Sequence, residues 1–123
     1  MDIIKLTIPA KAQYLLTARL ASSSIGARIN MTIGDVDDLK TAVAEGCILL
    51  ISSGRYTDIS IEYTIKDNTA KCEIKGLTER EDAVEADIET DLSKYILEAT
   101  TSELEIHKAG DTVDYVKFVK TGI

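Results

Sequence analysis

Glu45 is the residue of this 123-residue chain whose type and position come nearest to a catalytic group. It lies in the stretch Asp35–Ser53, which is the most apolar segment and the best helix candidate. A glutamate can act as a general base when a reacting group lies within hydrogen-bond reach. On a largely buried helix it is more commonly a solvated edge or a cap partner. A catalytic role for Glu45 therefore requires further residues that hold a substrate beside it.

The stretch around Glu45 has a helical pattern. Asp35 is a suitable N-cap, and the acids that follow it favour the positive end of a helix dipole. One apolar stripe runs along the segment: Leu39, Val43, Cys47 and Leu50. From Cys47 onward the segment is apolar nearly all round, so its C-terminal half should be the most buried helix. Ser52-Ser53-Gly54 should end it.

The two cysteines and the single histidine do not form a metal-site pattern. Cys47 and Cys72 each lie among apolar residues and form no Cys-x-x-Cys, so we expect two reduced core thiols. His107 alternates out of a predicted strand without a visible carboxylate or second histidine partner. We therefore expect it at the surface and predict no metal ligand.

The acidic balance of the chain bears on its partners. The net charge is −7, which argues against nucleic acid and against anionic membrane surfaces. Residues 79–91 alone carry seven acids and one arginine. The chain starts without the pattern of a signal peptide, and its longest apolar run, Cys47–Ile51, is too short to span a membrane. We expect a soluble cytoplasmic protein.

Before the central helix, the spacing of the apolar residues changes once, from a strand pattern to a helix pattern. Ile4, Leu6 and Ile8 alternate with polar residues, which predicts a strand that Pro9 ends. Apolar residues then recur at helical spacing over Ala10–Ile25, and Gly26 is expected to stop that helix. Residues 27–34 should connect it to the next helix.

The residues after the central helix predict two hairpins separated by a helix. Residues 59–65 and 70–75 alternate around the turn residues Asp67-Asn68. Thr78–Glu81 reads as a capping box that opens a helix to about Thr100, in one piece or broken near Thr90. Its predicted inward residues are Val84, Ile88, Leu92, Tyr95, Ile96 and Ala99. Glu103–Lys108 and Thr112–Lys120 should form the second hairpin.

The resulting order is β-α-α-β-β-α-β-β, in a single domain over residues 1–123. Antiparallel hairpins with intervening helices predict an α+β fold, a two-layer sandwich. Its mixed, mostly antiparallel sheet should be covered on one face by three helices. The opposite face should be solvated through Ser60, Glu62, Thr64, Lys71 and Glu73.

This order, the length and one segment resemble the anti-sigma-factor branch of the GHKL superfamily, the histidine-kinase-like ATPases. The segment Asp38-Leu39-Lys40, with Ala42-Val43, Glu45 and Cys47, is similar to the pattern D-L-K-x-A-V-x-E-x-C of the small RsbW-type serine kinases. The resemblance covers nearly the whole chain, but only residues 38–47 are specific. It implies a GHKL fold and makes Glu45 the matched catalytic position.

Three departures imply that the nucleotide site is degenerate. The family's magnesium-binding asparagine, four residues after the glutamate, is Leu49 here, and leucine offers no oxygen to Mg²⁺. The aspartate of the family's D-x-G motif, which meets adenine, is replaced by Ile74, although Gly76 remains. The stretch 89–94 replaces a glycine-rich phosphate turn and contains no glycine. We therefore expect no ATP or Mg²⁺ cofactor.

The resemblance then implies a protein-binding role, a pseudokinase in bacterial transcription regulation. The partner would be a sigma factor or an anti-sigma antagonist, and a homodimer is a further analogy. Arg19 matches a partner-facing arginine of the family's first helix. The alternative is that it lies on the solvent-exposed face of an amphipathic helix and has no partner role. The acidic run 79–91 could dock a basic partner or be a solvated face. The alternatives are a divergent ATP-dependent serine/threonine kinase, or an unrelated domain with an accidental match.

Overall fold

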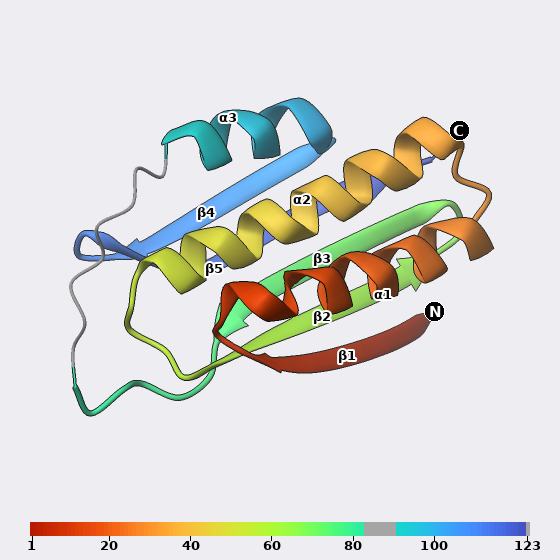
Figure 1. The fold of residues 1–123 in the computed structure, drawn as a ribbon. Coiled ribbons are helices and arrows are strands. Elements are labelled where there is room, and N and C mark those ends of the chain that lie inside the picture. Colours follow the sequence, from red (N-terminus) through yellow and green to blue (C-terminus); the bar gives the residue numbers. More distant parts are fainter. Residues whose placement is uncertain (83–90, 123) are drawn as a thin grey trace.

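The computed structural model describes residues 1–82 and 91–122, which form a five-stranded sheet with helices on one face (Figure 1). The strand order across the sheet is β1-β2-β3-β5-β4. The elements are β1 Asp2–Pro9, a 3₁₀ turn Ala12–Tyr14, α1 Leu15–Arg28, α2 Ile33–Ser52, β2 Asp58–Lys66, β3 Thr69–Gly76, α3 Asp91–Thr100, β4 Glu103–Ala109 and β5 Thr112–Thr121. This confirms the predicted α+β class and element order.

All four strand pairings among the described residues are antiparallel, so the sheet is not mixed as predicted. Both predicted hairpins are present. The first turns at Asp67-Asn68, where Asp67 has a φ of 54°, and the second at Gly110, where φ is 68°. Asp and Gly tolerate this left-handed conformation, so local turn chemistry explains both hairpins.

Helix α1 differs from the prediction at both ends. It starts at Leu15, after the short 3₁₀ turn, and it runs through Gly26 to Arg28. Gly26 is buried, and a Cβ there would lie 3.0 Å from Val36 Cγ2. The glycine therefore allows α1 and α2 to approach closely. The helix ends instead beside Asn30, whose φ of 57° suits a left-handed helix stop.

Helix α2 starts earlier than predicted, because Thr32 and not Asp35 is its N-cap. The Thr32 hydroxyl accepts a hydrogen bond from the Asp35 N–H, and the Asp35 carboxylate accepts one from the Thr32 N–H. This reciprocal pair is a capping box with aspartate in the third helical position. The predicted end is confirmed, with Ser53 as C-cap and Gly54 in a left-handed conformation.

The sheet has one buried and one largely polar face. Its inner face carries the largest buried side chains, among them Tyr63, Phe118, Ile59, Ile61 and Ile74. On the outer face Lys5 pairs with Glu62 at 3.5 Å. Ser60 was predicted to be solvated but is buried. Ser60 lies on β2, where its register partners are Thr7 on β1 and Lys75 on β3. Its small side chain is therefore flanked by a neighbouring side chain on each side.

The predicted helix start at Thr78 is wrong. Residues 78–82 are not helical and α3 begins at Asp91. The buried side chains of α3 are Ser93 and Leu97, whereas the predicted inward residues Leu92 and Tyr95 are exposed. The other predicted inward residues Val84 and Ile88 lie outside the described residues. None of the described helices is long and apolar enough to cross a membrane.

Candidate functional site

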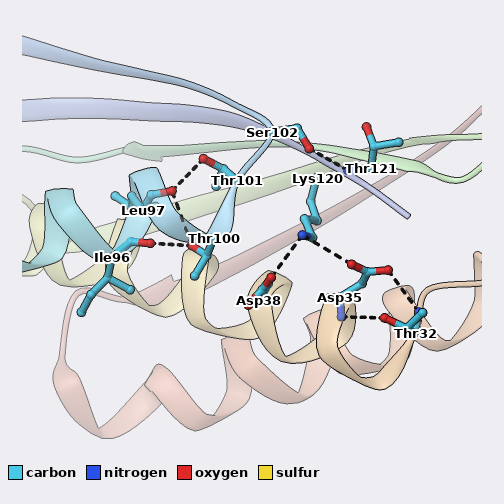
Figure 2. A network of polar contacts seen from close by, with 10 residues as sticks. All are labelled: Thr32, Asp35, Asp38, Ile96, Leu97, Thr100, Thr101, Ser102, Lys120 and Thr121. Carbon is cyan, nitrogen blue, oxygen red and sulfur yellow. Dashed lines mark hydrogen bonds and ion pairs between the residues drawn. The ribbon is translucent and has the colours of Figure 1, made fainter. Parts of the chain in front are cut away.

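Lys120 on β5 holds the N-terminal turns of α2, which include Asp38, against the last strand (Figure 2). Lys120 Nζ donates a hydrogen bond to Asp38 Oδ2 at 3.2 Å and lies 3.5 Å from Asp35 Oδ1. The hydrogen bonds between Asp35 and Thr32, helped by the positive charge of Lys120, lower the pKa of the Asp35 carboxyl. Asp38 therefore serves here to fasten α2 to β5.

The end of α3 is fastened near the same place, as Figure 2 shows. Thr100 Oγ1 donates to the Ile96 carbonyl at 2.8 Å, and Thr101 Oγ1 donates to the Leu97 carbonyl at 2.7 Å. The Thr121 N–H in turn donates to Ser102 Oγ at 3.2 Å. Side-chain hydroxyls thus bond two carbonyls in the last turns of α3.

Glu45 and Leu49 lie one turn apart on α2 and so share a helix face. Glu45 is half-buried, whereas Leu49 is only 1% exposed. A buried leucine supplies no oxygen, so the position that the resemblance assigns to a magnesium ligand holds a core side chain. Among the described residues, no group of three or more His, Cys, Asp or Glu side chains could hold a metal ion.

Ile74 lies beneath α2 and is fully buried. A Cβ on Gly46 would lie 2.6 Å from Ile74 Cδ1 and 3.8 Å from Val116 Cγ1. Real Cβ atoms do not come this close, so a side chain at position 46 would force the Ile74 side chain to move, and glycine allows α2 to pack at this depth without that shift. The side chain at position 74, where the resemblance expects an adenine-binding aspartate, is therefore in contact with α2.

Gly76 is covered by an aromatic ring. A Cβ at position 76 would overlap the ring of Tyr56, which is itself buried. Tyr56 belongs to the segment between α2 and β2, and nothing in its local pattern predicts this contact. The glycine that the resemblance retains thus provides room for a side chain of the protein itself.

Arg55 holds this segment in place. Its guanidinium lies 3.0 Å from Glu79 Oε1 and donates to Thr112 Oγ1 at 3.2 Å. The Arg80 N–H also donates to the Arg55 carbonyl at 2.8 Å, so residues 77–80 continue the sheet alongside 55–58. This backbone pairing explains why the predicted capping box does not form: the chain at Glu79 is extended, bridged to Tyr56.

The acidic run 79–91 is described in part. Glu79, Glu81, Asp82 and Asp91 lie in the described residues, and the other acids of the run do not. The stretch 89–94 likewise begins outside them, and its described part forms the first turn of α3. Ser93 is buried there. Whether the run binds a partner stays a prediction.

Arg19 lies on α1, half-buried and between two exposed leucines. Leu16 is 63% exposed and Leu20 is 60% exposed. Within residues 1–82 and 91–122, Arg19 forms no ion pair. An arginine without a charged partner, beside exposed apolar side chains, is suited to contact another protein.

Comparison with known proteins supports the resemblance over nearly the full length. No family model matches the chain. The serine-protein kinases RsbW of Bacillus thuringiensis (strain Al Hakam) and Bacillus anthracis (strain A0248) are each 24% identical to it over 136 residues. Each match covers 95% of this chain and 85% of the relative.

The fold comparison agrees with the sequence comparison. The crystal structure of the RsbU and RsbW domains of Rv1364c from Mycobacterium tuberculosis superposes with a TM-score of 0.70 at 16% identity, covering 99% of this chain. This chain is RsbW-like. It spans 32% of that two-domain chain, so the match concerns one domain of a larger protein.

The RsbW-like chain also carries a histidine–aspartate pair that sequence reasoning missed. His107 Nδ1 lies 2.6 Å from Asp114 Oδ1, and its ring stacks on Tyr115 with the centroids 4.7 Å apart. His107 is exposed as predicted, but the expectation that it has no carboxylate partner is wrong. The register of the β4–β5 hairpin, which places His107 opposite Tyr115, was the available signal.

The two thiols of the RsbW-like chain are reduced and buried, as predicted. Burial raises the pKa of the Cys47 thiol to about 12 and also raises that of Cys72. Thiolates are the nucleophilic form of cysteine, so both side chains are suited to packing rather than to chemistry.

Proposed function

We propose that this RsbW-like chain regulates transcription by binding a sigma factor or an anti-sigma antagonist, and that it does so without ATP. Its near full-length similarity to RsbW proteins supports the regulatory role. The burial of Leu49 is the observation that carries the independence from ATP. It puts an apolar core side chain at the position from which a metal ligand would have to come.

Two further contacts support the same proposal. Ile74 packs under Gly46, and the Tyr56 ring covers Gly76. A nucleotide would have to displace these two buried side chains, and Mg²⁺ would find no oxygen ligand at position 49. We therefore propose that Glu45, the one retained position of the family's catalytic group, has no nucleotide to act on. Single-domain organisation, cytoplasmic localisation and a homodimer remain predictions of this proposal.

The partner contact is proposed to include Arg19. The experiment is capture of partners from the native cell by the immobilised chain, followed by mass spectrometry. We expect a sigma factor or an anti-sigma antagonist to be retained, and Arg19→Glu to reduce its retention about tenfold or more. Lys71→Glu, a matched charge reversal on the outer face of β3, should leave retention unchanged. Retention of neither class of protein by the wild-type chain would refute the regulatory role.

The second candidate is a divergent ATP-dependent serine/threonine kinase, which the name of the relatives and the retained Glu45 favour. Titration with millimolar Mg-ATP separates the two candidates, because a ligand that binds the folded state raises Tm. We expect no rise in Tm and no calorimetric binding isotherm. A saturable isotherm, with phosphate transfer to a captured partner that Glu45→Gln abolishes, would establish the kinase instead.

A further inference from the structure

Strand β4 forms one edge of the sheet and, among the described residues, has no strand on its outer side. Its backbone therefore presents N–H and C=O groups that can pair with a further strand. The register of β4 against β5 shifts between His107 and Lys108. The regular part of this open edge is accordingly Glu103–His107.

Helix α3 lies over β4 and runs in the opposite direction (Figure 1). The start of α3 is near the end of β4, where the Lys108 side chain lies against that of Lys94 and lowers the pKa of the Lys94 ammonium. The end of α3 is near the start of β4, because only Thr101 and Ser102 separate the two elements. The helix and the strand therefore share two distinct ends.

These two ends differ in charge. Lys94 and Lys108 lie together at one end, and Asp91, which opens the helix, offsets one of their two charges. Glu98 and Glu103 belong to the other end, and both are exposed. Among the residues that the structure describes, neither these lysines nor these glutamates form a salt bridge. The open edge thus has a basic end and an acidic end, each able to take a charged partner.

A second copy of the chain, turned by 180°, complements both ends at once. A two-fold axis perpendicular to the sheet would set β4 antiparallel to its own copy, so the lysine end of each chain would meet the glutamate end of the other. Opposite charges on neighbouring strands stabilise a pair, whereas like charges destabilise it. Parallel addition would place lysines beside lysines and glutamates beside glutamates.

Apolar side chains lie between the two charged ends. Leu104 and Ile106 are half-buried on β4 and pack against the core. Tyr95 is 68% exposed on α3 and lies between Lys94 and Glu98, which are one turn apart and share a helix face. Aromatic and aliphatic side chains are typical of the centre of a protein interface, with charges at its rim.

We propose that β4 pairs antiparallel with β4 of a second copy, and that α3 packs beside its own copy across the same two-fold axis. One continuous sheet then runs through both molecules, and the lysine pair of each copy meets Glu98 of the other. This interface lies at the opposite edge of the sheet from β1 and away from α1 (Figure 1). It does not depend on the regulatory role, so either proposal can fail alone.

Charge-swapped variants of the full chain test this interface by analytical ultracentrifugation. Wild type should sediment as a dimer that salt weakens, because exposed charges are screened. Lys108→Glu and Glu98→Lys should each weaken the dimer at least tenfold, since each sets like charges against one another on both sides of the axis. An equimolar mixture of the two variants should restore dimerisation. In the mixed dimer one contact has its charges exchanged and the other is native.

Restoration in the mixture would also show that both variants fold. Leu92→Ser is a matched control, because Leu92 is 67% exposed but lies two positions before Lys94, on another side of α3. Lys71→Glu on the outer face and Ile3→Ser on β1, the other sheet edge, should likewise leave the dimer unchanged.

Three results would overturn the proposed interface. The first is a wild-type chain that stays monomeric at the highest concentration measured. The second is a mixture of the charge-swapped variants that dimerises no better than either variant alone. The third is a dimer that Ile3→Ser dissociates and the charge swaps leave intact, since the β1 edge would then hold the two copies together.

Discussion

Gly46 lies against Ile74 so closely that a Cβ on the glycine would be 2.6 Å from Ile74 Cδ1. Gly46→Ala should lower the free energy of unfolding by about 1–2 kcal/mol, because overpacking outweighs the gain in helix propensity. Urea denaturation measures this. Ile74→Val, which removes the Cδ1 methyl, should recover part of the loss in the double variant.

Gly34→Ala provides the matched control for that substitution. Gly34 also lies in α2, but a Cβ there would meet only Thr32 Oγ1, at 3.8 Å. The alanine should therefore leave stability unchanged or raise it by up to about 1 kcal/mol. Equal stability changes at positions 34 and 46 would contradict the close packing of α2 on β3.

The capping box predicts a pH dependence at the start of α2. Thr32→Ala should cost about 1 kcal/mol at pH 7, because the Asp35 N–H loses its acceptor. The pKa of Asp35 is lowered from its ordinary value of 3.8, so its carboxylate stabilises the fold above that pH. This contribution is lost as the pH falls through the lower folded pKa.

Asp35→Asn tests the carboxylate itself. The variant should be less stable than wild type at pH 7, and the difference should close as the pH falls below about 4. Denaturation midpoints measured from pH 7 to pH 2 follow this directly. A difference that persisted unchanged at pH 2 would show that the carboxylate charge is not responsible.

Tyr63 and Ser22 form a buried hydrogen bond between the sheet and α1, with 2.6 Å between their oxygens. Ser22 Oγ already donates to the Ala18 carbonyl, so the tyrosine hydroxyl is the donor to Ser22. Tyr63→Phe should cost about 1 kcal/mol and Ser22→Ala more, since the latter leaves a buried hydroxyl unpaired. Tyr115→Phe, whose hydroxyl donates to exposed Glu105, should cost almost nothing.

The buried thiol of Cys47 predicts slow chemistry in the native state. With its pKa raised to about 12, its thiolate fraction at pH 8 should be roughly a thousandfold below that of a free cysteine. Ellman's reagent should therefore react with Cys47 and Cys72 only after unfolding in urea. Rapid reaction of the native chain would contradict their burial.

The raised pKa of the Cys47 thiol also predicts that the protein loses stability at alkaline pH. A thiol held neutral by folding stabilises the fold fully below its unfolded pKa of about 8.5, and the contribution is lost as the pH rises toward the folded value. The free energy of unfolding should consequently fall between about pH 9 and pH 12. The fall should be smaller in Cys47→Ala, compared with its own value at pH 7.

The sequence by itself determined the element order and the hairpins. Strand and helix periods depend only on residues a few positions apart in the sequence. Turn residues such as Asp67 and Gly110 adopt the left-handed backbone conformation for local reasons. That the leucine at position 49 offers no oxygen to a metal ion could also be read from the sequence, because side-chain chemistry is known without coordinates, whereas its burial could not. The resemblance to RsbW proteins rested on the same local pattern around Glu45.

Only the tertiary structure decided how those elements meet. Gly26 reads locally as a helix stop but serves the approach of α1 to α2, and Thr78 reads as a cap but lies in extended chain beside Tyr56. Lys120 and Asp38 are 82 residues apart and still form a hydrogen bond. Local propensities are worth about 1 kcal/mol or less, so burial and pairing between distant segments override them.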